Sequence, residues 1–459
     1  MIQQGMIITF ILLVLMSPSG FAASLSLQEF LSAADKHDAV IREVKVQTKR
    51  VPFVVDAGMP SQKTTIELES QYGFDQRGDD DTRRFGARLS KSFVLSGTDV
   101  QASYGISQQP DRRENVTEYR LQQSLYKNAF GKDARLHKQS LTLGQRAQLK
   151  SLEDAYEGRV AQLVVMYYGL KKAQFDAQIA MQALKKAKTL RQYVGEKHRQ
   201  NIATATDVDK ADLQVVLYEE DVIAKTRALE HAQASAATAS GVSKLHVQDV
   251  DSKKILNVLS NSPVFKLHDA SLSPMRWKEI IDSRLEQSRL QLEINRGLDA
   301  PDVKVFGGIS NDKSERFSSK VEQSEVFVGM SLSIPLGDDS SRAIQRLEAS
   351  RSLELDAELK RQLQVWKVKE KELRLAFEQF AKAWELNQQK VRLSQSIIAA
   401  ETKRYEIGKV ELDRVIALRV DLLRYQFALR ASEFEQSQAA VQWLAHTDQL
   451  LGALDMRLR

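Results

Sequence analysis

Two stretches of this chain lack proline and repeat one plan, and this duplication most limits what the chain can fold into. Prolines are absent from residues 111–262 and 336–459. Each stretch follows a strand-like segment, runs as a long polar helical pattern, breaks at a turn and resumes as a second helix. The start-to-break spacing is 70 residues from Gly131 to Asn201 and 71 from Gly337 to Gly408. Such repetition predicts a duplicated architecture.

The length of the repeated helix favours a spanning role over a catalytic one. A helix of about 66 residues at about 1.5 Å per residue is about 100 Å long, several times the width of a small domain. Glycine and proline are scarce, at 21 and 8 residues of 459, and 27% of residues are charged. That composition suits long solvated helices. We therefore expect transport or scaffolding before catalysis.

Several kinds of chemistry have no support in the sequence. Cysteine is absent, which excludes disulfides, thiolate metal sites, a cysteine nucleophile and a cysteine-linked lipid anchor. No basic block is interleaved with aromatic residues, so no nucleic-acid partner is expected. The seven histidines show no metal-binding spacing, and no phosphate loop or nucleophile elbow is present. We expect no enzyme, no cofactor and no metal site, although the aspartates at 79–81 fit either a divalent ion or a solvated loop.

The N-terminus has the pattern of a secretory signal peptide. The apolar run at residues 6–16 is too short to span a bilayer, and small residues at Gly20 and Ala22 predict cleavage after Ala22. The absence of Lys or Arg before the run departs from that pattern, and a buried N-terminal helix is the alternative. No other segment approaches 18 apolar residues. A mature form in a membrane would therefore be there as a β-barrel.

Between the helical stretches, apolar and polar residues alternate with period two. Residues 25–50 predict one amphipathic helix, and Pro52 and Pro60 bound a linker. Alternation then occupies residues 64–74, 85–89, 100–106, 303–309 and 326–334, with polar loops predicted at 76–83, 108–115 and 311–323. This pattern fits a sheet half-buried on a soluble core, or strands with one face toward lipid and the other toward a lumen. Export favours the second interpretation.

The number of strands then predicts an oligomer. Four to six strands cannot close a barrel, since the smallest barrels have about eight. Open sheet edges are not tolerated in lipid. Several chains must therefore pool their strands if these segments lie in a membrane.

Four short segments carry a resemblance to a known family. The two helix breaks are NIATATDV at residues 201–208, followed by Ala211, and YEIGKVELDRV at 405–415. The two strand-to-helix transitions are QSLYKNAFG at 123–131 and VGMSLSIPLG at 328–337. In this order and at duplicated spacing, they resemble the TolC-type outer-membrane efflux family, the outer membrane factors. Asn201 stands where the family has glycine, and asparagine tolerates the left-handed backbone of a tight turn.

The resemblance implies a fold that is mainly α with β. Duplicated long helical hairpins would form a coiled-coil periplasmic tunnel, and the strands would contribute to a trimeric transmembrane β-barrel. The implied function is the exit duct of a tripartite efflux or type I secretion system, conducting substrate passively from an inner-membrane pump. Implied partners are two further copies, a periplasmic adaptor, the pump and outer-membrane lipid. The implied location is the outer membrane of a Gram-negative bacterium, with an extension into the periplasm.

These expectations divide the chain into seven segments. They are a signal peptide (1–22), an N-terminal periplasmic helix and linker (23–60), first barrel strands (61–126), a first helical hairpin (127–240), an equatorial segment and helix (241–300), second barrel strands (301–335), and a second hairpin with the C-terminus (336–459). Residues 84–107 look like an extra hairpin, because the simplest family members contribute four strands per chain. Whether it joins the barrel stays open at this point.

The resemblance assigns the candidate functional residues to the two helix breaks. Expected adaptor-docking residues are Asn201, Ile202, Ala203, Thr204, Ala205, Thr206, Gly408, Lys409, Val410 and Glu411. Candidate pore-constriction residues are Asp207, Tyr405 and Arg414. Some members carry acidic residues six and nine positions after the second glycine, where this chain has Arg414 and Ala417. Arg414 either lines the pore or pairs with a nearby acid such as Glu411.

Two other functions compete with the exit duct. A soluble periplasmic coiled-coil adaptor also uses long helices, but adaptors usually have one hairpin flanked by small β-rich domains. A filament-like scaffold would not need Ile, Val and Phe on alternating strands. Membrane fractionation separates the duct from both. The sequence does not identify the cargo.

Overall fold

The computed structural model describes most of the chain and divides it into two units. Described are residues 23–73, 82–109, 111–243, 245–247, 255–257, 259, 275–297, 299–316, 319–335 and 339–458. The expected signal peptide at 1–22, the aspartates at 79–81 and Gly337 lie outside these residues. One unit comprises Met1–Thr48, Leu152–Arg276 and Leu363–Arg459, and the other Lys49–Ser151 and Trp277–Gln362.

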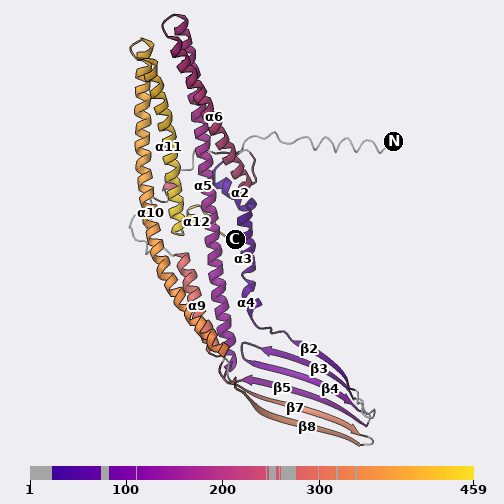
Figure 1. Cartoon of the computed structure of the whole chain (residues 1–459). Helices are drawn as coiled ribbons and strands as arrows, with labels where there is room; N and C mark the ends of the chain where they lie inside the picture. Colours follow the sequence, from indigo (N-terminus) through magenta and orange to yellow (C-terminus); the bar gives the residue numbers. More distant parts are fainter. Residues whose placement is uncertain are drawn as a thin grey trace, which may run out of the picture. The chain divides into compact units, whose positions relative to one another are not determined.

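Two long helical hairpins dominate the structure and confirm the predicted duplication (Figure 1). They consist of α5 (Lys132–Arg199) with α6 (Ala205–Ser240), and α10 (Asp339–Glu406) with α11 (Leu412–His446), which the short α12 (Leu450–Ala453) follows. The first helix of each hairpin has 68 residues. In the described residues, no helix has the length and apolarity needed to cross a membrane.

The core of the helical unit lies on one face of α5 and at the end of α11. Buried residues of α5 recur every three or four positions, as one face of a helix requires. They are Tyr156, Val160, Leu163, Val164, Tyr167 and Leu170. Near the end of α11 the buried apolar residues are Ala439, Ala440, Val441, Trp443 and Leu444. The Trp443 indole donates to Glu370 of α10 at 3.3 Å, which satisfies a buried polar atom between the two helices of this hairpin.

The N-terminal elements pack on the helical unit. Strand β1 (Ala23–Leu25) pairs in parallel with β6 (Leu245–Val247), and α2 (Leu27–His37) begins at a capping box between Ser26 and Glu29. The Phe30 ring of α2 lies 5.6 Å from the ring of Tyr167 on α5. The Tyr167 hydroxyl donates to the Leu25 carbonyl at 3.0 Å. Ring packing and this hydrogen bond therefore fix α2 against α5.

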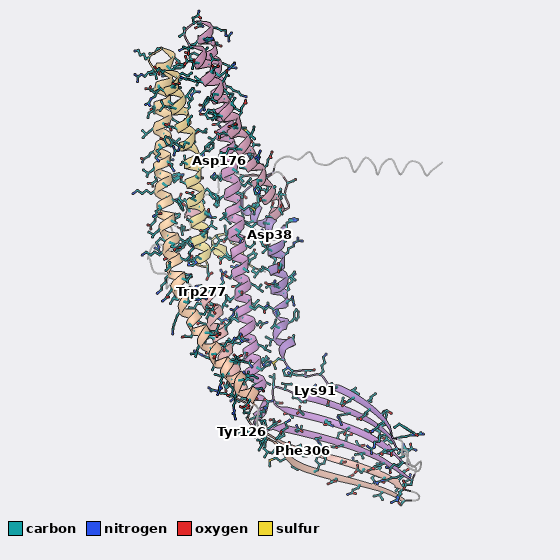
Figure 2. The ribbon with its side chains drawn as sticks, in the orientation of Figure 1. Asp38, Lys91, Tyr126, Asp176, Trp277 and Phe306 are labelled. Carbon is teal, nitrogen blue, oxygen red and sulfur yellow. The ribbon has the colours of Figure 1, made fainter. Side chains whose placement is uncertain are left out.

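The single helix predicted over residues 25–50 is wrong, because it breaks at Asp38. The Asp38 carboxylate accepts from the Ile41 amide at 3.0 Å and so caps α3 (Ala39–Arg50). Arg159 of α5 donates to the same carboxylate at 2.6 Å. Asp38 lies beside α5 in Figure 2. The predicted linker between the prolines contains a further short helix, α4 (Phe53–Gly58), with Pro52 at its N-cap.

The second unit contains a six-stranded antiparallel sheet. Its strands are β2 (Thr65–Gly73), β3 (Thr82–Phe93), β4 (Thr98–Gln108), β5 (Arg112–Ser124), β7 (Asp302–Arg316) and β8 (Ser319–Ser333), in the order β2-β3-β4-β5-β7-β8. The extra hairpin suspected at 84–107 forms β3 and β4 and lies inside the sheet. The same unit holds α9 (Arg276–Arg296), apart from its first residue, and the 3-10 turn η1 (Ala129–Gly131).

The register gives the sheet one apolar and one polar face. Cross-strand partners on the apolar face include Ile66↔Leu89, Leu68↔Ala87, Ala102↔Tyr119, Tyr119↔Ile309, Ile309↔Val326 and Val305↔Met330. Most of the large side chains on this face are exposed; Val326 is 76% and Val328 81% exposed. The opposite face carries Glu67, Glu69, Arg88, Gln101, Glu118 and Arg120 among others. An exposed apolar face of this size calls for a partner or a lipid environment.

The strands are longer than the alternation of apolar residues indicates. Residues 311–323, predicted as a polar loop, are mostly the paired ends of β7 and β8, where Lys313–Glu322 and Lys320–Glu315 form ion pairs of 2.6 and 2.7 Å. In the loop predicted at 108–115, Gln108 still belongs to β4 and Arg112 already belongs to β5. Both loop predictions are wrong because the strands continue into polar residues. At the ends of β7 and β8, opposite charges on neighbouring strands replace the apolar pairs.

Candidate functional site: the two helix tips

The first tip closes with a turn that relies on a left-handed residue. Asn201 has φ 59°, and its N–H donates to the His198 carbonyl at 2.9 Å. The Ile202 N–H donates to the Lys197 carbonyl at 2.9 Å. This pair of bonds is the Schellman arrangement, which satisfies the last carbonyls of α5. Asparagine fits because its backbone reaches positive φ more readily than most residues.

The second tip repeats this turn with glycine. Gly408 has φ 73°, its N–H donates to the Tyr405 carbonyl at 3.0 Å, and the Lys409 N–H donates to the Arg404 carbonyl at 2.9 Å. A Cβ atom at Gly408 would meet nothing within 4 Å, so backbone conformation alone selects glycine here. The two tips therefore match bond for bond, as the duplication predicts.

The tips differ in how the second helix of each hairpin begins. At the first, Thr204 and Asp207 form a capping box: the Asp207 amide donates to the threonine hydroxyl at 3.1 Å, and the Thr204 amide donates to the Asp207 carboxylate at 2.9 Å. The hydrogen bond from the Thr204 amide lowers the pKa of Asp207. At the second, Glu411 occupies the N-cap position without a side-chain bond. Asp207, a candidate pore residue, thus has a local structural role.

The two tips pack against each other through a small shared core. It comprises Leu190, Val194, Ala211, Tyr405, Leu412 and Val415. The rings of Tyr193 and Tyr405 lie 6.1 Å apart, and the Lys197 ammonium stands 4.9 Å and 4.5 Å from their centroids. Lys197 also donates to the Tyr405 carbonyl at 3.1 Å. Its charge therefore sits at the C-terminal end of α10, where the helix dipole favours a cation.

The pore candidates occupy different environments in the protomer. Tyr405 is 8% exposed, and its burial raises the pKa of the phenol. Arg414 is exposed, and its guanidinium forms no ion pair with any residue in the described part of the chain, Glu411 included. The neighbouring Asp413 pairs instead with Lys210 at 2.8 Å and so links α11 to α6. Arg414 is thus the candidate that presents its charge to solvent.

The expected docking residues lie on the surface of the two turns. All ten are exposed except Ala203 and Val410, which are half-buried. Ile202 and Ile407 are each 66% exposed, so both tips present an apolar side chain. Ile407, Lys197 and Tyr193 were not singled out from the sequence. The readable signal for Lys197 was a basic residue in the last turn before the break.

Other polar clusters of the helical unit are structural. Glu157 is 1% exposed, pairs with Arg276 and accepts from the Leu451 amide at 3.1 Å; desolvation raises its pKa.

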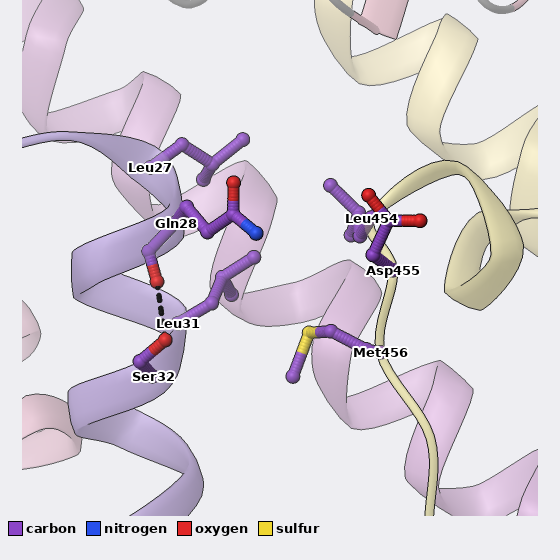
Figure 3. Close-up of a pocket in the computed structure, with 7 residues that line it drawn as sticks. All are labelled: Leu27, Gln28, Leu31, Ser32, Leu454, Asp455 and Met456. Atoms are coloured by element: carbon purple, nitrogen blue, oxygen red, sulfur yellow. Dashed lines mark hydrogen bonds between the residues drawn. The ribbon is translucent and has the colours of Figure 1, made fainter.

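A pocket of about 110 Å³ between α2 and the C-terminal segment is lined by Leu27, Gln28, Leu31, Ser32, Leu454, Asp455 and Met456 (Figure 3). Asp455 is its single ionisable residue, which gives no acid–base pair. Among described residues no cluster of metal-binding side chains occurs.

The solved structures that this fold matches include membrane channels and an outer-membrane protein. The chain matches the transmembrane channel CusC at TM-score 0.68 and 12% identity, over 95% of this chain and 93% of that one. It matches the MtrE outer-membrane channel of Neisseria gonorrhoeae at 0.66 and 14%, over 92% and 89%. It matches the outer-membrane protein VceC of Vibrio cholerae at 0.65 and 13%, over 94% and 97%.

At these identities the likeness establishes the fold. No protein-family profile matches the sequence, and no curated protein matches it. The fold is mainly α with β, as the sequence predicts, and it is the fold of outer membrane factor channels.

Proposed function

We propose that this chain is a TolC-type exit duct that acts as a homotrimer in the outer membrane of a Gram-negative bacterium. Its signal peptide would be removed after Ala22. The helical hairpins would extend into the periplasm, and the duct would conduct cargo passively from an inner-membrane pump. Efflux and type I secretion are both compatible with this role.

The apolar face of the six-stranded sheet carries the proposal. Its side chains alternate with a polar face, and within the described part of the chain the edge strands β2 and β8 each pair with one neighbour. In lipid, unpaired edges are costly, so the sheet needs further copies of itself for closure. Strands β7 and β8 have 15 residues each, more than the about 9–11 residues that a strand needs to cross a bilayer. Their charged ends are the surplus. Those ends would stand outside the membrane.

The helix tips supply the contact to the rest of the export machine. They combine exposed turns with apolar Ile202 and Ile407 and a shared core that fixes both turns relative to each other. A periplasmic adaptor would dock on this paired surface. A soluble adaptor or scaffold is the alternative function, and the uncovered Val326 and Val328 on the sheet disfavour it.

Fractionation followed by reconstitution tests the proposal. The mature protein is expected in the outer-membrane fraction, to leave it only with detergent, and to have a native mass of three chains. Reconstituted into a planar bilayer, it should conduct ions. A soluble monomer in the periplasmic fraction would refute the proposal and favour the adaptor.

A further inference from the structure

We propose that the β3–β4 hairpin is a widening element of the outlet: three copies of the chain close a barrel of eighteen strands, whose bore is wider than an α-helix with its side chains. This inference rests on the proposed trimeric duct and goes beyond it, because it assigns the width of the barrel to one hairpin of this chain. A chain built without the hairpin would supply four strands, and three such chains would close twelve.

The hairpin is a continuous part of the sheet. Strand β3 pairs with β2 from Thr82 to Ser90 and with β4 from Arg83 to Phe93, and β4 pairs with β5 along all of its residues. The apolar face continues across this region through Leu68↔Ala87 and Ala102↔Tyr119. Removal of β3 and β4 would therefore interrupt the face that we assign to lipid. A loop folded away from the sheet would not keep this register.

The turn of the hairpin is also built into the start of α5. Gly97 and Gly131 have φ 67° and 76°, and a Cβ atom on Gly131 would lie 2.2 Å from the Leu95 carbonyl oxygen. Arg135 donates to that same carbonyl at 3.0 Å. Gln123 of β5 donates to the Ser96 carbonyl at 2.9 Å. The backbone of the turn at residues 94–97 thus packs directly on the backbone at the helix start. Both positions need glycine, because a Cβ atom at either would collide with the facing backbone.

The two edge strands, β2 and β8, can pair between neighbouring copies in the same antiparallel way as the strands within one copy. All five pairings within the sheet are antiparallel, and the number of strands is even. Strand β8 of one copy and β2 of the next therefore run in opposite directions. Three copies of six strands then make an all-antiparallel barrel of eighteen.

The strand number fixes the width of the outlet. With strands about 4.8 Å apart and tilted by about 40°, eighteen strands give a backbone diameter of about 36 Å, and twelve give about 24 Å. Side chains occupy about 5 Å at each wall, half the spacing of packed sheets. The open cross-section of the larger barrel is then about threefold greater, on the order of 25 Å across. A bore of this width exceeds the diameter of an α-helix with its side chains, about 10–12 Å.

Imaging of the whole trimer tests the inference directly. The detergent-extracted wild-type trimer, placed in lipid nanodiscs, is expected to show eighteen strands with β3 and β4 in the wall. A wall of twelve strands with the hairpin outside it would overturn the inference and leave the duct intact. A particle with no closed wall would instead refute the proposed function.

A bore measurement provides the second test. Polyethylene glycols of graded size are added in a planar bilayer to the side where β4 ends and β5 begins. Polymers that fit into the barrel lower its conductance, and polymers wider than the bore leave the conductance unchanged. Deletion of residues 82–108 leaves β2 and β5 antiparallel, so a narrower barrel can still close. The deletion should reduce the open cross-section, inferred from the largest polymer that enters, about threefold. An unchanged polymer cutoff in a folded, conducting deletion trimer would overturn the inference; if the deletion does not fold, the strand count decides.

Discussion

Single residues with a left-handed backbone determine the shape of both tips. Gly408→Val should strain the second turn by on the order of 1 kcal/mol, because its φ of 73° disfavours a branched side chain. The open space around Gly408 rules out a steric clash, so the trimer should assemble at normal levels. We expect export to fall sharply while trimer abundance, measured on unheated gels, stays unchanged.

A matched variant isolates the backbone as the cause. Gly408→Asn adds a polar side chain of similar size, yet asparagine already adopts φ 59° at position 201. It should retain most export. Export by Gly408→Val equal to wild type would show that this tip has no part in docking.

The capping box at Asp207 gives the first tip a defined pH dependence. Its pKa in the folded chain lies below the ordinary 3.8, so its contribution is complete above that value and is lost as pH falls through the folded pKa. Protection of the amides in the first turn of α6, taken as the measured exchange rate relative to the intrinsic rate at the same pH, should therefore be high at neutral pH and fall in acid below about pH 4. Asp207→Asn should show lower protection at neutral pH and little further loss on acidification. Wild-type protection that stays unchanged at a pH well below the folded pKa would contradict the role of this cap.

Sequence reasoning at the residue scale identified backbone needs better than side-chain environments. The positive φ values of Asn201 and Gly408 follow from residue type and position. Burial of Tyr405 and the Lys197 contacts do not, because they depend on how the two hairpins pack. The capping box was readable as threonine followed three residues later by an acid, but the pore hypothesis directed attention elsewhere.

At the scale of elements, close packing of a turn on a helix start is the most sensitive contact in the sheet unit. Gly131→Ala would place a Cβ against the Leu95 carbonyl and strain a φ of 76°. We expect a marked loss of assembled trimer. Gly105→Ala in β4 is the control, because its Cβ would meet nothing within 4 Å and should leave assembly near wild type. Equal trimer yields for both variants would show that the packing of the 94–97 turn on Gly131 is not needed for assembly.

The contact between the two hairpins should depend on apolar packing rather than on charge. Leu412 is 3% exposed in the tip core, so Leu412→Ala should cost about 2–5 kcal/mol locally. Asp413→Asn removes the exposed ion pair to Lys210, which is worth about 0–1 kcal/mol. Hydrogen exchange at both tips should rise strongly in the first variant and slightly in the second. The reverse order would assign the contact to the ion pair.

Element boundaries were predicted well where one residue type sets them and poorly where pairing does. The breaks near Asn201 and Gly408 are where the helices end. The ends of β7 and β8 were read as loops, because a charged strand such as 311–316 has no apolar alternation and is stabilised by Glu322 and Lys320 across the ladder. The break at Asp38 has a local signal, an aspartate that caps the Ile41 amide, but its partner Arg159 is distant in sequence and was not predictable.

At the scale of the whole assembly, symmetry repeats each exposed charge of the chain around the axis. A threefold axis would bring three copies of each tip together and turn a single exposed charge into a ring. Arg414 is the pore candidate with an exposed charge and no ion pair in the described protomer, whereas Asp207 is held in its cap. Symmetry therefore makes Arg414 the residue whose replacement tests where the duct narrows.

Replacement of Arg414 should change the ion preference of the reconstituted duct. Three guanidinium groups in a narrow opening repel cations and attract anions, so the wild type should prefer anions more than Arg414→Asp does, with Arg414→Gln between them. Reversal potentials across a salt gradient measure this preference. The differences should shrink toward 1 M salt, where the Debye length falls to about 3 Å. Identical reversal potentials for all three proteins at low salt would place Arg414 outside the pore and leave Asp207 as the better constriction candidate.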